Sequence, residues 1–296
     1  MGIKKDTTAD KIEDRGRNKP ATLQLNFVIP VAVLSLLVLT AIFAPLLAPY
    51  SPVATVLKER LLPPFFADGG SSAHILGTDL LGRDILSRVI YGTRVSLSIS
   101  FLVIFITSSI GTILGMIAGY LGRRIDTFLM RITDVTLAFP IILIAILLAV
   151  ILGPSLKTVV LAISIIGWAP YARLIRGETL KVSQADFVAQ ARIIGSSSTR
   201  IIIKHIFPNV VNPLIVLATL QVGLIILLEA ALSYLGAGIP PPTPSWGSMV
   251  SDGRNLIDTA WWISFFPGLV IGLVVLSGNF LGDWIRDKLD PKLRQL

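Results

Sequence analysis

The sequence offers very few side chains that could carry out catalysis. It holds two histidines, His74 and His205, and no cysteine. Because the two histidines are far apart in the chain, they predict neither a paired-histidine zinc site nor a Ser-His-Asp triad. The sequence also lacks a G-x-x-x-x-G-K-[ST] loop for nucleotide phosphates. We therefore expect a transport or receptor subunit rather than an enzyme, and any ATP that drives its work must bind to another subunit.

Two polar residues lie within long apolar stretches and are candidates for contact with a transported solute. Glu229 lies in "QVGLIILLEAALSYLGAG", where an ionisable side chain is costly and needs a partner or water. It either lines a water-filled translocation path and touches substrate, or it forms hydrogen bonds to neighbouring helices as a structural element. Asn279, in the last apolar stretch, is a second candidate for the path.

The composition indicates the solvent that surrounds these residues. Hydrophobic residues make up 53% of the 296 residues and charged residues only 15%, a balance unlike that of ordinary soluble domains. Runs of about 20 apolar residues can cross the hydrocarbon core of a bilayer as helices. We therefore predict an all-α, polytopic membrane protein with six transmembrane helices, near residues 26–48, 95–120, 127–152, 158–175, 210–235 and 261–282.

The positions of Lys and Arg predict the orientation in the membrane. The net charge is +8, but the basic residues cluster beside apolar runs, so we expect lipid rather than nucleic acid as their partner. Most of them lie in segments on the same side as the N-terminus, and the positive-inside rule places that side in the cytoplasm. The prediction is a cytoplasmic tail over residues 1–25 and a six-span domain over 26–296, with outer segments at 50–93 and 236–260, a cytoplasmic loop at 184–209 and both termini inside.

The second half of the first outer segment has helical periodicity. Apolar residues from Leu81 to Ile90 alternate with a polar face that includes Arg83 and Arg88. This pattern predicts an amphipathic helix on the membrane surface, capped by Thr78 or Asp79. It leaves open whether the helix docks a partner or only leads into the second span.

Two shorter patterns concern helix packing. Gly111, Gly115 and Gly119 recur every four residues, which places them on one helical face and lets another helix approach closely. Arg131 and Asp134 have the i, i+3 spacing of an intrahelical ion pair, and we expect them to pair near the inner interface.

A polar stretch, "DFVAQARIIGSSSTRIIIKHIFPN", interrupts the apolar runs on the inner side. It predicts a helix over about 184–194 that presents Phe187, Ala191 and Ile194 on one side and ends at Gly195 in the left-handed conformation. A second helix would begin near Ser198 and end before Pro208. The pattern alone fits either a docking element or an amphipathic linker on lipid headgroups.

The same stretch resembles the cytoplasmic loop of bacterial ABC importer permeases. Their pattern is E-A-A, three residues, G, nine residues, I-x-L-P; Ala191, Gly195 and Pro208 match it here, while Ala189, Gln190, His205 and Phe207 depart from it. Segments such as "LGTDLLGRDILSRVIYGTRVSL", "MRITDVTLAFP" and "GDWIRDKLDPKLRQL" resemble peptide/nickel-type permeases, most closely the C-type permease of dipeptide and oligopeptide importers.

This resemblance implies a type I permease fold in the bacterial inner membrane. It implies a second homologous permease, an external substrate-binding protein, and two ATPase subunits that bind ATP and Mg; this chain would bind no cofactor or metal. The implied cargo is a dipeptide or oligopeptide, with nickel chelates, glutathione or another small solute as alternatives. An ion-coupled secondary transporter is a more distant alternative, since we find no internal repeat. The residues implied to couple to an ATPase are Phe187, Ala189, Gln190, Ala191, Arg192, Gly195, His205 and Pro208.

Overall fold

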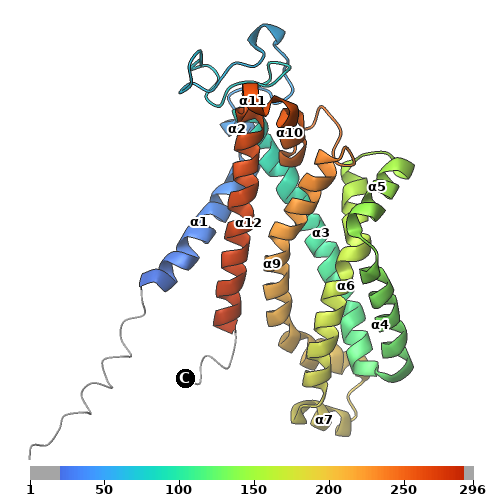
Figure 1. The fold of residues 1–296 in the computed structure, drawn as a ribbon. Coiled ribbons are helices and arrows are strands. Elements are labelled where there is room, and N and C mark those ends of the chain that lie inside the picture. Colours follow the sequence, from blue (N-terminus) through green and yellow to red (C-terminus); the bar gives the residue numbers. More distant parts are fainter. Residues whose placement is uncertain (1–20, 290–296) are drawn as a thin grey trace, which may run out of the picture.

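The computed structural model of the protein describes residues 21–289, and this part of the chain is helical and contains no strand (Figure 1). The elements in chain order are α1 (Ala21–Ile42), α2 (Ala44–Leu47), η2 (Leu57–Glu59), α3 (Ile85–Leu121), α4 (Arg123–Ala138), α5 (Ile141–Leu152), α6 (Leu156–Ser183), α7 (Asp186–Ile193), α8 (Ser198–Ile201), η3 (Ile202–Ile206), α9 (Phe207–Tyr234), α10 (Trp246–Gly253), η4 (Arg254–Leu256), α11 (Ile257–Ala260) and α12 (Trp262–Leu289).

Every predicted span coincides with a helix or a helix pair of this fold. Four helices are long and apolar enough to cross a membrane: α3, α6, α12 and the continuous helix Ser198–Tyr234, which contains α9. The first span corresponds to a shorter apolar helix, Phe27–Ile42. The third is broken, since α4 and α5 are bent by 81° relative to each other. Pro140 explains the break, because it has no N–H and keeps Phe139 extended, with a ψ of 131°.

The closest helix packing in the bundle is between α3 and α6, along the glycine stripe that the sequence predicted. A β-carbon at Gly111 would lie 2.5 Å from the carbonyl oxygen of Trp168, and one at Gly115 would lie 2.7 Å from that of Ala172. Only glycine leaves room for such an approach of two backbones. The expected close contact at this stripe is therefore confirmed, and α6 is the partner helix.

The other helices complete the bundle around this pair. The α9 helix packs on α3, α6 and α12, and α1 packs on α3 and α12. The polar elements gather at the two ends: residues 50–84 with α10 and α11 lie at one end, and α7 lies at the opposite end (Figure 1). The fold therefore separates two polar surfaces by the length of the spans.

The amphipathic surface helix expected in the first outer segment is not present. The helix begins at Ile85 and continues without a break to Leu121, so it is the start of the second span. Its N-cap is Asp84 rather than Thr78 or Asp79: the Asp84 carboxylate accepts a hydrogen bond of 2.8 Å from the N–H of Ser87. The polar face is buried by tertiary contacts, which a hydropathy pattern does not contain.

Two further expectations change. Asp134 does not pair with Arg131; instead it accepts a hydrogen bond of 2.6 Å from Arg173 on α6, because the neighbouring helix brings a second arginine within reach. Residues 1–20 of the predicted N-terminal tail, 1–25, lie outside the described residues. Residues 21–25 belong to α1.

Candidate functional site

The α7 helix forms the centre of the polar surface at one end of the bundle. It spans Asp186–Ile193 and is therefore shorter than the predicted 184–194. Gly195 follows with a φ of +82°, and the N–H of Ser196 donates to the carbonyl of Ala191 at 3.0 Å. This is the hydrogen-bonding pattern of a left-handed glycine that ends a helix. The expected conformation of Gly195 is confirmed.

One side of α7 is anchored in the membrane bundle. Val188 and Ala191 are buried in an apolar cluster with Met116 of α3, Ile175 of α6 and Ile206 of η3. The Arg192 guanidinium lies over the Tyr120 ring of α3, 5.0 Å from its centroid, at the distance of a cation–π contact. A displacement of α7 must therefore be transmitted to these helices.

The opposite side of α7 is uncovered. Ile193 is 85% exposed and Ile194 is 83% exposed, while Ala189 and Gln190 are also exposed. The predicted grouping of Phe187, Ala191 and Ile194 on one side is therefore wrong for Ile194, which is exposed whereas Ala191 is buried. Ile194 is the C-cap of the helix, so it lies in the turn to Gly195 and no longer follows the helical period that Ala191 follows. Adjacent exposed isoleucines are the kind of apolar patch that marks a protein interface.

The second half of the polar stretch leads directly into the fifth span. Ser197 caps α8, a π-turn covers Ile202–Ile206, and α9 begins at Phe207. Pro208 therefore lies at the start of α9. The prediction that a separate helix ends before Pro208 is wrong. The helix runs on through this point from Ser198 to Tyr234, so Pro208 lies where the π-turn passes into α9. The ring of the half-buried His205 lies 6.3 Å from that of Phe187, between centroids.

The two candidates for the translocation path lie in different surroundings. Glu229 is fully buried, and its carboxyl group accepts hydrogen bonds from Ser96 at 3.2 Å and from Ser233 at 2.8 Å. The bond from Ser96 joins α9 to α3, whereas Ser233 lies on α9 itself; both bonds agree with the structural interpretation of Glu229. Asn279 lies on α12 with an exposed side chain. The structure does not bring the two residues into one site.

A network of charged side chains at the opposite end escaped the sequence analysis. Arg83 donates to Asp79 at 2.5 Å, and Arg88 lies 3.2 Å from Asp79 and 3.2 Å from Asp252 of α10. Burial raises the pKa of the Asp252 carboxyl, while Arg88 and Arg83 act to lower it. The network joins α10 to the start of α3. The sequence signal that could have revealed this network is the polar face with Arg83 and Arg88 directly before an apolar span.

Within residues 21–289 no group of three or more His, Cys, Asp or Glu side chains could hold a metal ion. His74 approaches Asp84 at 2.9 Å and Glu59 at 3.3 Å, so its ring joins the outer segment to the N-cap of α3. The two ends of the described bundle therefore carry exposed side chains on α7 at one end and buried ion pairs at the other.

The sequence matches two family profiles. Residues 111–295 match the profile described as "Binding-protein-dependent transport system inner membrane component". Residues 27–64 match the one described as "N-terminal TM domain of oligopeptide transport permease C". Together the two matches cover the first span and the chain from the middle of the second span to residue 295.

Similar curated proteins cover nearly the whole chain. The dipeptide transport system permease protein DppC of Haemophilus influenzae is 41% identical over 94% of this chain and 92% of its own length. The protein of the same name from Escherichia coli is 44% identical over 94% and 91%. Among solved structures, a chain of the inward-facing MetNI methionine ABC transporter aligns with a TM-score of 0.58 and 15% identity, covering 70% of this chain and 98% of its own. That likeness shows the type I permease fold.

Proposed function

We propose that this chain, which belongs to the family of binding-protein-dependent transport system inner membrane components, is the C-type permease of an ATP-driven importer of dipeptides or oligopeptides. The names of its relatives support the cargo: they are dipeptide permeases in Haemophilus influenzae and Escherichia coli and a di/tripeptide permease in Pseudomonas aeruginosa. Nickel chelates, glutathione and other small solutes are the alternative cargoes.

The observation that carries the proposal is the two-sided α7 helix. Its exposed side holds Ile193 and Ile194, and its buried side holds Val188 and Ala191. We assign the exposed side to a groove on an ATPase subunit. When the ATPase pair closes on ATP, α7 would move with its subunit, and the anchored side would pull on α3, α6 and η3. The permease would then alternate between inward-facing and outward-facing states, as in rocking-type transport.

We call residues 186–209 the coupling segment, and the residues that the sequence predicted for ATPase coupling would have different roles within it. Phe187, Ala189 and Gln190 are exposed on α7 and would contact the ATPase beside the two isoleucines. Ala191 and Arg192 would hold α7 to the bundle, and Gly195 would set its end. His205 and Pro208 would join the segment to the fifth span.

The complete transporter would place four kinds of partner around this chain. A second homologous permease would supply the other half of the path, two ATPase subunits would bind ATP and Mg, and an external binding protein would deliver the cargo. Membrane lipid would surround the spans. The absence of a nucleotide-binding loop from the sequence supports the assignment of ATP to separate subunits.

The orientation follows from the same assignment. We place α7 and both termini in the cytoplasm and residues 50–84 with α10 outside the membrane, where the binding protein would dock. Within the membrane, Glu229 would brace α9 against α3, and Asn279 is the better candidate for facing cargo because its side chain is exposed in the single chain.

Site-directed cross-linking tests the partner assignment, and the absence of native cysteine makes it clean. Ile194→Cys should form a cross-link to an ATPase subunit when the whole transporter is expressed together. Leu46→Cys is a matched control, since Leu46 is 82% exposed at the opposite end and should form none. If Ile194→Cys forms no cross-link in a transporter that still carries dipeptides, α7 does not contact an ATPase subunit and the assignment is wrong.

Competition for uptake tests the cargo. Cells that depend on this transporter should take up a labelled dipeptide, and unlabelled dipeptides should compete for that uptake. If only a nickel chelate or glutathione competes, the importer assignment stands and the peptide assignment is wrong.

A further inference from the structure

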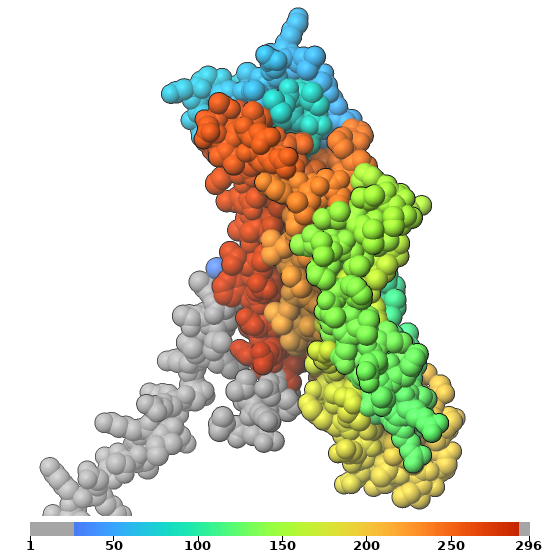
Figure 2. Space-filling model, turned by 45° about the vertical axis from the view of Figure 1, so that its right-hand side comes forward, coloured from blue at the N-terminus to red at the C-terminus, as the bar shows by residue number. Residues whose placement is uncertain are grey.

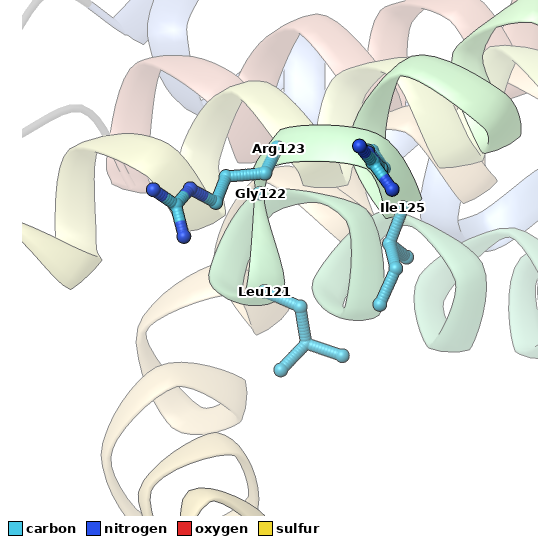
Figure 3. A pocket seen from close by; sticks show the side chains of 5 residues that line it. Leu121, Gly122, Arg123 and Ile125 are labelled. Atoms are coloured by element: carbon cyan, nitrogen blue, oxygen red, sulfur yellow. The ribbon is translucent and has the colours of Figure 1, made fainter.

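The turn between α3 and α4 carries an unbalanced cluster of positive charge. Arg123, Arg124 and Arg131 line one shallow hollow of about 550 Å³ together with Thr127 and Phe128. A second hollow beside it shares the first two arginines (Figure 3). All three arginines are exposed. We call these three residues the arginine patch.

The acidic residues of α4 do not neutralise the arginine patch, because they face α6. Asp126 accepts two hydrogen bonds of 2.6 Å from the Arg176 guanidinium, and Asp134 accepts one from Arg173. No ion pair joins the arginine patch to a carboxylate within residues 21–289. Helix α4 is thus divided into an acidic side that is paired and a basic side that is unpaired.

The surroundings of the arginine patch are apolar. Phe128 is 65% exposed, and Leu121 and Ile125 are exposed beside it. Figure 3 shows the Arg123 side chain leaving the turn on the side opposite Ile125. Figure 2 shows α4 and α5 running along the surface of the molecule, uncovered by other helices in that view. Cations beside exposed apolar side chains are typical of the level at which phosphates meet acyl chains.

The position of the α3–α4 turn along the membrane normal also fits contact with lipid phosphates. The turn lies at the same end of the bundle as α7 (Figure 1), between the predicted ends of the second and third spans. It follows directly on Tyr120, the residue beneath Arg192. With the orientation proposed above, the arginine patch lies at the inner leaflet, where anionic lipids concentrate and attract basic residues.

From these observations we propose that the arginine patch is a binding site for the headgroup of an anionic phospholipid of the inner leaflet. The guanidinium groups would neutralise the lipid phosphate, and Phe128 with Ile125 would contact the upper part of an acyl chain. Because α4 is one half of the bent span, a lipid bound there would stabilise one arrangement of α4 against α6. The inference rests on the proposed orientation, which the Ile194→Cys cross-link to an ATPase subunit tests separately.

The test uses the complete transporter with Arg124→Gln and Arg131→Gln combined, reconstituted in nanodiscs of phosphatidylcholine with or without phosphatidylglycerol. Native mass spectrometry measures phosphatidylglycerol that stays bound. Loss of two positive charges that face an anionic membrane surface should weaken the retention of phosphatidylglycerol roughly 25-fold. Lys58→Gln combined with Arg60→Gln removes the same charge from exposed positions of the outer segment and should leave retention unchanged.

A conservative variant separates lipid from protein as the occupant. A lipid phosphate needs positive charge, so Arg124→Lys with Arg131→Lys should retain phosphatidylglycerol nearly as well as the wild type. Equal retention by the glutamine variant and its control would overturn the proposal. So would a glutamine variant that keeps the lipid but loses an ATPase or permease subunit, because the arginine patch would then be a protein interface.

Discussion

The Arg192 guanidinium lies 5.0 Å from the centroid of the Tyr120 ring, so the coupling segment contacts the last turn of α3 directly. This contact, together with the burial of Val188 and Ala191, makes α7 an extension of the bundle rather than a free loop. The predictions below follow from that attachment and from the packing behind it.

Substitution at either side of the Arg192–Tyr120 contact should loosen α7. Arg192→Gln and Tyr120→Leu should each weaken its attachment by about 0.5–1 kcal/mol, the usual strength of an exposed cation–π contact. Hydrogen exchange of the α7 amides should rise in both variants. The double variant should exchange little faster than either single one; fully additive effects would show that the two residues act independently.

Gly195→Ala should uncouple ATP hydrolysis from uptake. With φ at +82°, a β-carbon at this position costs about 1–2 kcal/mol of backbone strain, although no other atom lies within 4 Å. Gly177→Ala is the matched control, since Gly177 also has open space around it but lacks the positive φ. Cargo carried per ATP hydrolysed should fall only for the first variant, at equal expression. A normal ratio for Gly195→Ala would refute the role of this turn.

Gly115→Ala should destabilise the bundle itself. Its β-carbon would lie 2.7 Å from the Ala172 carbonyl oxygen, and overpacking of this kind costs about 1–3 kcal/mol. Gly272→Ala, on α12, has nothing within 4 Å and serves as control. The melting temperature of the purified transporter should drop for Gly115→Ala alone; equal melting temperatures would mean that the α3–α6 contact is looser than described.

Glu229→Gln should leave uptake near normal, whereas Glu229→Leu should not. An amide can still accept a hydrogen bond from Ser96 or Ser233, while leucine leaves both hydroxyl groups without this acceptor, at about 1–3 kcal/mol for each buried group left unsatisfied. Melting temperature and uptake should fall together for the leucine variant. Loss of uptake in the glutamine variant with an unchanged melting temperature would instead favour a direct role in the translocation path.

The features that the sequence predicted well are those fixed by local physics. Apolar length predicted the spans, and the four-residue spacing of Gly111, Gly115 and Gly119 predicted a close helix contact. Gly195 was predicted because few other residues adopt a positive φ without strain. Each of these depends on one residue or one helix.

The features that escaped prediction depend on a second helix. Asp134 pairs with Arg173 because α6 lies beside α4, and no spacing within α4 contains that information. The amphipathic pattern at Arg83 and Arg88 suggested a surface helix, but Asp79 and Asp252 bury that polar face by ion pairing. Val188 rather than Phe187 faces the bundle, because the clusters of α3 and η3 decide which side of α7 is covered.

The central claim is that the exposed isoleucines of α7 link ATP hydrolysis to peptide uptake. It is tested most directly by measuring dipeptide uptake and ATP hydrolysis together in proteoliposomes that contain the whole transporter, with Ile193→Ser and Ile194→Ser combined and with Leu46→Ser as control. We predict that the double variant keeps its melting temperature but loses uptake, and that its ATPase subunits dissociate or hydrolyse ATP without transport. Normal uptake per ATP in the double variant would contradict the claim.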